Sequence, residues 1–320
     1  MTRLLITREL PDAVIGVAQN RFDMTLRNVP RPLSQDEASK ALTEYDAILP
    51  TLGDAFGADS FADINAPRCK ILANFGVGYN HIDVAAAAKH NITVTNTPGA
   101  VTDATADIAL TLMLMSTRRA AEGERLVRAG AWTGWHPTQM LGMHMSGKVL
   151  GIIGMGRIGK AIARRAQAGF GMHVVFHNRS KIENLDVPAQ QLPTLHDVMK
   201  TADIVVLAVP ATSETHHLIG AGELAAMQPH AHLINIARGD IVDESALIAA
   251  LQNKEIAAAG LDVYEHEPKV PEALRALDNV TLLPHLGTAA LEVRTNMGLM
   301  GVDNLVAFFD GRIPPNLVQP

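Results

Sequence analysis

Three side chains with complementary chemistry follow apolar runs in the second half of the chain. Arg238 follows HLINIA, Glu267 lies in the turn EHEP after GLDVY, and His285 follows NVTLLP. A guanidinium can bind a carboxylate through two parallel hydrogen bonds and polarise the neighbouring carbonyl. An imidazolium can donate a proton to that carbonyl, while a carboxylate holds the imidazole in one tautomer and favours its charged form. This set predicts hydride transfer to a 2-keto acid.

Each of these residues also has an ordinary structural alternative. Arg238 could pair with Asp240 on the surface. His285 could be a core or capping histidine, and Glu267 a solvated acid of a turn. The strand ends of an open α/β sheet meet at the edge where such folds bind ligands, so the joint placement favours the catalytic interpretation.

A glycine pattern that suits a dinucleotide follows the apolar run KVLGIIG and opens a helical stretch. Its glycines are Gly154, Gly156 and Gly159. The first permits a tight turn, the second lets backbone N–H groups reach a pyrophosphate, and the third lets the helix approach the strand. The amino end of the helix adds partial positive charge for the phosphates. A tight turn without a ligand is the alternative, and the strand–turn–helix context disfavours it.

The tip of the next apolar run, VVFHNRS, indicates which dinucleotide is bound. NAD-binding units commonly carry an acid here, which accepts hydrogen bonds from the ribose and would repel a 2′-phosphate. This chain has Asn178, Arg179 and Ser180 instead. A guanidinium with two neutral donors suits a phosphate dianion, so we expect NADP(H) to be preferred and NAD(H) to be possible. A solvated loop with an incidental arginine is the alternative.

The composition fits a two-domain protein of a reducing compartment. The 320 residues are 48% hydrophobic and 19% charged with a net charge of -6, which argues against a nucleic-acid partner. The single cysteine, Cys69, precedes an apolar run, so we expect a buried thiol without a disulfide or a nucleophilic role. No run approaches the ~20 apolar residues of a membrane span, which predicts a cytoplasmic protein with no membrane partner.

Alternating strands and helices are expected to position the candidate residues. The first part of the chain has apolar runs typical of strands at 3–7, 45–51, 69–76 and 91–98, with a helix over 82–90. The second part has such runs at 148–154, 173–177, 203–209, 232–237, 257–263 and 279–284, and helical stretches separate the first five. This alternation predicts an α/β protein with mostly parallel sheets.

Long helical patterns over residues 102–130 and 289–311 indicate how the chain is divided. The second of them would pack back on residues 1–99. We therefore predict two Rossmann-like, doubly wound parallel-sheet domains, the first of them discontinuous. Residues 1–99 and 288–320 would form the substrate (catalytic) domain, and residues 100–287 the dinucleotide-binding domain.

The histidine pattern does not predict a metal site. His216 and His217 are adjacent, so on a helix or strand they would point in different directions and could not easily chelate one ion. The spacing of a zinc-binding helix is missing at His136, His144, His173 and His177. The expected reaction needs no metal, because a guanidinium and an imidazolium already polarise the carbonyl.

Taken together, the motifs resemble those of the D-isomer-specific 2-hydroxyacid dehydrogenases. The signatures are GIIGMGRIG, NIARGDIVDESAL, AAGLDVYEHEP and NVTLLPHLGTA, in that family's order and spacing. FGVGYNHIDVAAA and TADIALTLML extend the likeness to the whole chain. The loop AWTGWHPTQMLGMHMSGK and the NRS tip are most similar to the glyoxylate/hydroxypyruvate reductase branch.

The resemblance implies roles for the matching positions. Arg238, Glu267 and His285 would be catalytic, and Arg238 and His285 would also contact the substrate. Val77 and Gly78 would offer backbone N–H groups to its carboxylate. The cofactor would be bound by Thr105, Gly154, Gly156, Arg157, Ile158, Gly159, Asn178, Arg179, Ser180, Val209, Pro210, Thr215, Ala237 and Asp262. Asp262 would also maintain the geometry of the site.

The resemblance also implies a partner and excludes two neighbouring activities. The family works as dimers, and the loop with Trp132 and Trp135 would reach the partner subunit, with interdomain packing as the alternative. Glu267 stands where formate dehydrogenases of this fold carry a glutamine, and Val77 where phosphite dehydrogenases use a lysine. Neither of those reactions is therefore expected.

We accordingly expect an oxidoreductase that transfers a hydride from NADPH to a small 2-keto acid, glyoxylate or hydroxypyruvate, and forms the D-2-hydroxy acid. One carboxylate-binding arginine argues for a substrate that is mono-anionic at its non-reacting end. Two alternatives stay open. One is an NAD-preferring dehydrogenase for a larger acid of the phenylpyruvate or 2-ketogluconate type, because residues near Leu52 and Phe75 leave the pocket size undetermined. The other is a nucleotide-sensing scaffold similar to corepressors.

Overall fold

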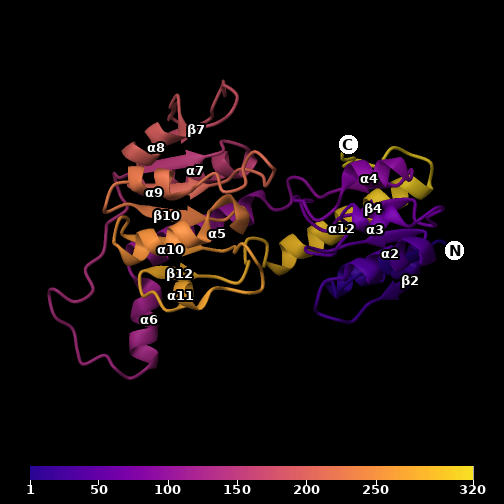
Figure 1. Ribbon diagram of the computed structural model, residues 1–320, viewed down its shortest axis with the longest axis horizontal. Helices are drawn as coiled ribbons and strands as arrows, with labels where there is room; N and C mark the ends of the chain where they lie inside the picture. Colours follow the sequence, from indigo (N-terminus) through magenta and orange to yellow (C-terminus); the bar gives the residue numbers. More distant parts are fainter. Residues whose placement is uncertain (320) are drawn as a thin grey trace. The chain divides into compact units, whose positions relative to one another are not determined.

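The computed structural model describes residues 1–319, which form two separate units (Figure 1). Residues Met1–Val101 and the segment that starts at Thr288 make the first unit, and Thr102–Gly287 makes the second. The first unit is thus assembled from both ends of the chain. The substrate and dinucleotide roles expected of the two domains stay predictions.

A parallel sheet of five strands forms the centre of the first unit. In sheet order these are β2 (Asp23–Leu26), β1 (Arg3–Ile6), β3 (Ala47–Leu49), β4 (Ile71–Ala73) and β5 (Thr93–Thr95). One face packs against α2 (Gln35–Glu44), α3 (Asp59–Ala62) and α4 (Val84–Lys89), and the other against α1 (Asp12–Arg21) and α12 (Leu291–Phe309). This 2-1-3-4-5 order is one of the common doubly wound arrangements.

A parallel sheet of seven strands forms the centre of the second unit. Its order is β12 (Val280–Leu282), β11 (Ala258–Leu261), β10 (His232–Asn235), β9 (Ile204–Leu207), β6 (Val149–Ile153), β7 (His173–His177) and β8 (Ala189–Gln191). The chain runs outward from β6 to β8 and then returns to place β9 on the other side of β6. Doubly wound sheets bind dinucleotides at the carboxyl edge of such a reversal.

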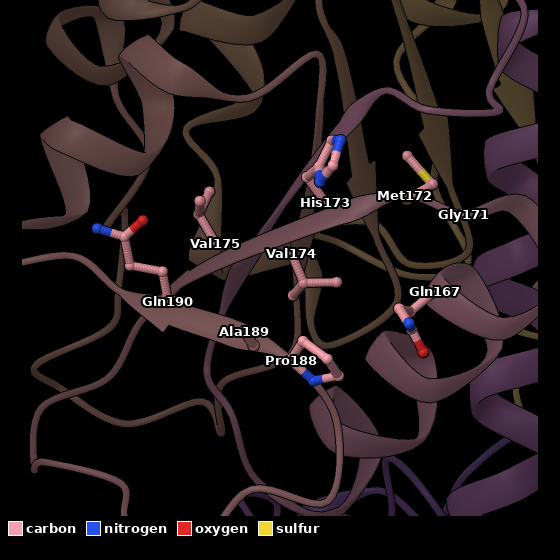
Figure 2. A pocket seen from close by; sticks show the side chains of 9 residues that line it. All are labelled: Gln167, Gly171, Met172, His173, Val174, Val175, Pro188, Ala189 and Gln190. Atoms are coloured by element: carbon pink, nitrogen blue, oxygen red, sulfur yellow. The ribbon is translucent and has the colours of Figure 1, made fainter.

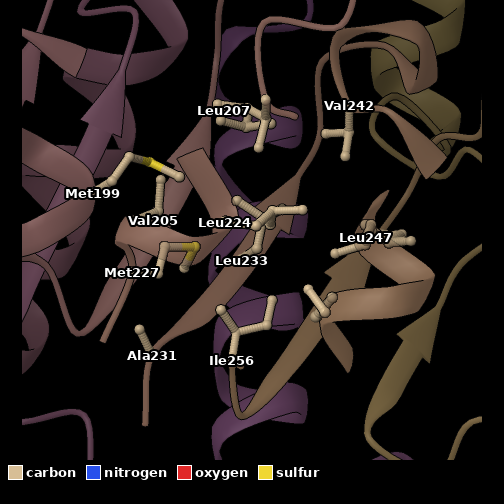
Figure 3. Close-up of a cluster of buried hydrophobic side chains, with 14 of the residues drawn as sticks. Met199, Val205, Leu207, Leu224, Met227, Ala231, Leu233, Val242, Leu247 and Ile256 are labelled. Atoms are coloured by element: carbon tan, nitrogen blue, oxygen red, sulfur yellow. The ribbon is translucent and has the colours of Figure 1, made fainter. Parts of the chain in front are cut away.

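Alternating side chains fill a core on each face of the seven-stranded sheet. Val205 and Leu207 of β9 contact the core beneath α8 (Leu195–Thr201), α9 (Ala221–Ala226) and α10 (Glu244–Gln252). Figure 3 shows part of this core. Ile204 and Val206 contact the opposite core, beneath α5 (Thr102–Thr117) and α7 (Arg157–Phe170). Strands that are apolar on both faces are typical of parallel sheets covered by helices, so the predicted fold class is confirmed.

The single helix predicted over residues 102–130 is wrong, because the chain leaves the helical path after Thr117. Helix α5 ends there, Arg119 is left-handed with φ 52°, and a second helix, α6 (Ala120–Arg128), follows. The N–H of Met143 donates to the Thr117 carbonyl at 2.8 Å, and a Cβ at Gly142 would lie 2.2 Å from the same oxygen. A distant segment thus takes the carbonyl that a continuing helix would use.

Two edge strands, β2 and β8, have no counterpart in the sequence prediction. The three residues of β8 are AQQ, without an apolar run. The strand supports the end of its neighbour β7, because the Gln191 amide donates to the carbonyls of Asn178 at 3.2 Å and Ser180 at 3.1 Å. This edge strand therefore helps to shape the tip that was expected to select the cofactor.

Two further features concern the cysteine and the apolar stretches. Cys69 is buried as expected, and burial raises the pKa of its thiol to about 12. A thiol with so high a pKa is unreactive near neutral pH. Within residues 1–319, every helix is too short or too polar to cross a bilayer.

His232 opens β10 in a buried position, where its Nδ1 lies 2.8 Å from the Ser116 hydroxyl of α5. Burial, with a smaller contribution from the charge of His230, lowers the pKa of His232 from 6.5 to about 4. The folded state therefore keeps this imidazole neutral at pH values where the unfolded chain already binds a proton.

We expect acid to destabilise the fold through His232. Above pH 6.5 the imidazole is neutral in both the folded and the unfolded state. Between pH 6.5 and 4 only the unfolded state gains the proton, which lowers the free energy of unfolding by up to about 3 kcal/mol. His232→Asn removes this titration. Acid therefore lowers the stability of the parent more than that of the variant. The melting temperature of the parent minus that of the variant should be smaller at about pH 5 than at about pH 7.5, and the same value at both would contradict the account.

Candidate active site

The glycine turn after β6 has the shape that a pyrophosphate site requires. Gly154 has φ 99°, and a Cβ there would lie 2.7 Å from the carbonyl oxygen of Ala208. A Cβ at Gly159 would lie 2.2 Å from the Gly154 oxygen, so α7 could not approach the strand. A Cβ added at Gly156 would meet no atom of residues 1–319 within 4 Å beyond its two chain neighbours, so this position faces open space. The 14-residue helix α7 begins at the next residue. These residues fit the phosphates of a dinucleotide.

The tip of β7 carries the three residues expected to select the cofactor. Asn178 Oδ1 accepts the N–H of Met155 at 3.3 Å, and Asn178 Nδ2 donates to the Ser180 hydroxyl at 3.2 Å. The Arg179 side chain is 88% exposed and donates to a carboxylate oxygen of Glu214 at 2.7 Å. The tip thus presents a cation that a neighbouring loop already partly neutralises. The sequence prediction missed Glu214, because this contact joins two loops 35 residues apart.

The three candidate catalytic residues follow β10, β11 and β12, which are neighbours in the sheet. His285 Nδ1 lies 2.9 Å from Glu267 Oε2, and Glu267 Oε1 accepts the N–H of Tyr264 at 3.0 Å. Arg238 lies near enough for its charge to act on the Glu267 carboxylate. The structure therefore brings all three residues to one region of the carboxyl edge. Their catalytic roles stay predictions.

Burial and charge compete at these groups. Burial would raise the pKa of Glu267, but the hydrogen bond and charge of His285, the Tyr264 N–H and Arg238 together hold that pKa below its usual value. Burial lowers the pKa of the Arg238 guanidinium, against the charges of Glu267 and Asp240. An ionised carboxylate can only accept, so the proton shared with Glu267 belongs to His285 Nδ1. His285 Nε2 is then the ring nitrogen that Glu267 does not engage, and it can give up a proton only from the charged, doubly protonated imidazole.

Asp262 fixes the loop that carries His285. Its carboxylate accepts the N–H groups of Leu286 at 2.6 Å and Gly287 at 2.8 Å, and its backbone carbonyl accepts that of His285 at 2.9 Å. The Asp262 side chain is buried, and burial raises its pKa although the two N–H groups oppose the shift. These bonds hold His285 at φ 55°, a left-handed conformation that is unfavourable for a residue with a side chain.

Gly239 brings the segment after Arg238 against the turn that carries Glu267. A Cβ at position 239 would lie 1.8 Å from the carbonyl carbon of Tyr264, so the two backbones could not approach with any other residue. The Tyr264 hydroxyl donates to the Leu283 carbonyl at 2.9 Å, which joins the same turn to the end of β12. The sequence prediction missed this role, because a lone glycine after an arginine does not reveal which backbone it faces.

Val77 and Gly78 lie in the first unit, in the loop after β4. Asn74 donates to the carbonyls of Gly76 and Gly78, each at 3.0 Å, and Asn96 donates to the carbonyl of Val77 at 2.9 Å. The N–H groups of Val77 and Gly78 have no hydrogen-bond partner among residues 1–319. Two asparagines thus hold three successive carbonyls and leave these N–H groups available to an anion. Their contact with a substrate stays a prediction.

The other predicted cofactor residues lie along the carboxyl edge of the second sheet or beside it. Thr105 at the start of α5 donates to the Gly287 carbonyl at 3.1 Å, and Thr215 donates to the Pro210 carbonyl at 2.7 Å. The remaining ones follow β9, follow β10 or open α7: Val209, Ala237, Arg157 and Ile158. Their contacts with a nucleotide, and that of Asp262, stay predictions.

The expectation that His216 and His217 diverge is wrong. Their rings stack with centroids 4.0 Å apart, because His217 is left-handed with φ 49° and the pair lies outside any helix or strand. His217 Nε2 lies 3.0 Å from Glu265 Oε1. Periodicity arguments do not apply to such a turn, which is why the sequence could not reveal the arrangement.

A hollow of about 400 Å³ opens at the other end of β7 (Figure 2). Side chains of Gln167, His173 and Gln190 line it, from the last turns of α7 and from β7 and β8. His173 opens β7, whereas the tip at Asn178 follows its last residue. The hollow therefore lies away from the carboxyl edge and is not the candidate site.

Known proteins are similar to this chain in both sequence and fold. Residues 110–287 match the family model described as D-isomer specific 2-hydroxyacid dehydrogenase, NAD binding domain. A glyoxylate reductase of Pyrococcus horikoshii is 43% identical over 99% of this chain and 96% of its own length.

Two solved structures resemble the chain over nearly its whole length. The NADPH-dependent glyoxylate/hydroxypyruvate reductase of Sinorhizobium meliloti, in complex with NADP and malonate, is 35% identical with a TM-score of 0.88, covering 99% of this chain and 96% of its own. The D-mandelate dehydrogenase of Rhodotorula graminis is 28% identical with a TM-score of 0.86, covering 100% and 98%.

The chain belongs to the D-isomer specific 2-hydroxyacid dehydrogenase family. It is an NAD(P)-dependent oxidoreductase that is similar to glyoxylate reductases. The family and the enzyme class predicted from the motifs are thereby confirmed.

Asp262→Asn should lower kcat/KM for a 2-keto acid by about 10- to 100-fold, because an amide nitrogen then faces a backbone N–H and the loop of His285 shifts. Asp243 is the matched control, since its carboxylate accepts the N–H groups of Ser245 and Ala246 at the start of α10. Asp243→Ala should cost about 1 kcal/mol of stability and leave kcat/KM unchanged. Equal activity of the two variants would contradict the positioning role of Asp262.

Proposed function

We propose that this protein reduces glyoxylate and hydroxypyruvate with NADPH. The observation that carries the proposal is the 2.9 Å contact between His285 and Glu267, made where Arg238 follows the adjacent strand β10. This set supplies a proton donor, its orienting base and a carboxylate anchor. The 43% identity to a glyoxylate reductase supports the choice of small substrates.

The side chains divide the work of the reaction. Arg238 binds the substrate carboxylate and draws electron density from the neighbouring carbonyl. The dinucleotide supplies the hydride that forms the new C–H bond. His285 donates its Nε2 proton to the carbonyl oxygen, so that the carbonyl group becomes an alcohol, and Glu267 stabilises the imidazolium before the transfer. The enzyme adds one hydride and one proton in each turnover.

The products of the two substrates differ in a useful way. Glyoxylate gives glycolate, which is achiral, whereas hydroxypyruvate gives glycerate, which has a stereocentre. The D-specificity that we propose is therefore tested with hydroxypyruvate, by chiral chromatography of the glycerate. Formation of L-glycerate would contradict it.

A larger substrate is the competing possibility within the same chemistry. The similarity to a D-mandelate dehydrogenase shows that this fold also serves an enzyme named for an aromatic hydroxy acid. A scaffold of the corepressor kind fits less well, because it has no need of a histidine and a carboxylate in hydrogen-bond contact. Steady-state kinetics with glyoxylate, hydroxypyruvate, phenylpyruvate and 2-ketogluconate separates the three outcomes. Higher kcat/KM for the larger acids, or no turnover at all, would overturn the proposal.

Arg238→Lys should reduce kcat/KM for glyoxylate by about 100-fold or more, because an ammonium group cannot form the two parallel bonds of a guanidinium. Arg68→Lys is the matched control. Arg68 donates to both carboxylate oxygens of Asp46 at 2.8 and 3.1 Å on the surface of the first unit. The kcat/KM of Arg68→Lys for glyoxylate should be unchanged. A fully active Arg238→Lys would show that the substrate is anchored elsewhere.

We also propose that NADPH is preferred over NADH. Arg179 stands at the tip of β7 without an acid on the same tip, and the Sinorhizobium meliloti relative is described as NADPH-dependent. The Glu214 carboxylate at 2.7 Å competes with a 2′-phosphate for the guanidinium. Because both side chains are exposed, this pair contributes at most about 1 kcal/mol, and a phosphate dianion can displace it.

Two substitutions should move the cofactor preference in opposite directions. Arg179→Ala should raise KM for NADPH about 10-fold or more and leave KM for NADH within about 2-fold. Glu214→Gln should lower KM for NADPH by about 2- to 5-fold, because the competing charge is gone. Both are measured by titrating each cofactor at saturating glyoxylate. An NADH preference in the parent enzyme would contradict the proposal.

We propose that the chain forms a homodimer through α6 and the loop at 131–147. No residue of α6 is buried, and Val127, Trp132, Trp135 and Leu141 have exposed fractions of 60%, 51%, 79% and 68%. Figure 1 shows this segment extending away from the body of the second unit. So many exposed apolar side chains are typical of an interface. Sedimentation equilibrium should give twice the chain mass, and Trp135→Ser should shift it toward the monomer.

A further inference from the structure

Two histidines and a glutamate gather beside the catalytic turn without a part in the proposed reaction. His216 and His217 lie in the loop after β9, and Glu265 lies in the turn after β11. One ligand atom of each lies within 4.8 Å of the other two, and His217 Nε2 is 3.0 Å from Glu265 Oε1. His216 and His217 are exposed and Glu265 is partly buried, so an ion could reach the group from solvent.

The backbone holds both segments in place. The N–H of His217 donates to the Asp240 carbonyl at 2.8 Å, and the N–H of Glu265 donates to the buried Glu244 carboxylate at 3.0 Å. The left-handed φ of 49° at His217 turns the chain so that the two imidazoles stack. The three donors are therefore presented by turns that hydrogen bonds anchor.

The donor set matches the preference of a particular class of ion. Imidazole nitrogens with one carboxylate suit zinc and its neighbours, whereas magnesium and calcium take oxygen ligands. Tetrahedral bonds of about 2.0–2.1 Å place ligand atoms roughly 3.3 Å apart. The 3.0 Å contact between His217 and Glu265 already has nearly that separation, and a ligand atom of His216 lies within 4.8 Å of both.

We propose that His216, His217 and Glu265 bind a divalent transition-metal ion of the zinc type, with water in the fourth position. The ion replaces the hydrogen bond between His217 and Glu265. It joins the loop that carries Thr215 to the turn that carries Glu267, two residues beyond Glu265. The metal has no part in the hydride transfer, so the site is independent of the proposed function.

The untagged chain is tested with zinc by equilibrium dialysis and with Co²⁺ by visible absorption. We expect each chain to bind one ion at this cluster. Co²⁺ bound there should give the visible absorption bands of tetrahedral coordination. Removing a residue that only hydrogen-bonds to a metal ligand typically weakens metal binding about 10- to 100-fold. Glu265→Gln and His217→Gln should therefore weaken this ion at least as much. Zinc at 100 times its Kd should raise the melting temperature of the parent by about 5 °C.

His230→Gln is the matched control, because His230 Nε2 lies 2.6 Å from an Asp203 oxygen and no third side chain of residues 1–319 joins this pair to form a metal-binding group. This variant should keep the ion, the Co²⁺ bands and the melting shift. Equal zinc stoichiometry and affinity in the parent and in Glu265→Gln would overturn the proposal. So would a loss of the ion in His230→Gln of the same size as in His217→Gln.

Discussion

The candidate site depends on the hydrogen bonds that the buried carboxylate of Asp262 accepts from the backbone. Parallel strands bring the ends of β10, β11 and β12 to one edge, but they do not orient the side chains that follow. Asp262 binds the backbone N–H groups of Leu286 and Gly287 and thereby fixes the loop in which His285 is left-handed. Glu267 meets His285 only because this loop, and the turn packed against Gly239, are both held.

The elements that the sequence predicted well are those whose signal is local. Buried strands such as β6, β9 and β10 are continuous apolar runs, and the glycines at 154, 156 and 159 have a spacing that a single motif explains. The features that escaped prediction depend on contacts between distant segments. Helix α5 ends because Met143 takes the Thr117 carbonyl, and β8 exists because it pairs with β7. Neither partner is visible in the residues of the element itself.

The loop after β9 is the least predictable part of the candidate site and connects its two halves. Glu214 in this loop binds Arg179 at the tip of β7, while His217 binds Glu265 beside the catalytic turn. Sequence patterns identified the chemistry at each strand end, because arginine, histidine and acids are conspicuous there. They could not show that one loop contacts both the region expected to bind the nucleotide and the region expected to bind the substrate.

A double-mutant cycle between Glu267 and His285 tests the central claim most directly, through kcat/KM for glyoxylate with NADPH. If the two side chains act as one unit, His285→Gln alone should lose nearly all the activity that the double variant loses. Glu267→Gln should then cost little in that background, a coupling of about 1.4 kcal/mol or more. Strictly additive losses would show that the contact does not serve catalysis, and would contradict the account.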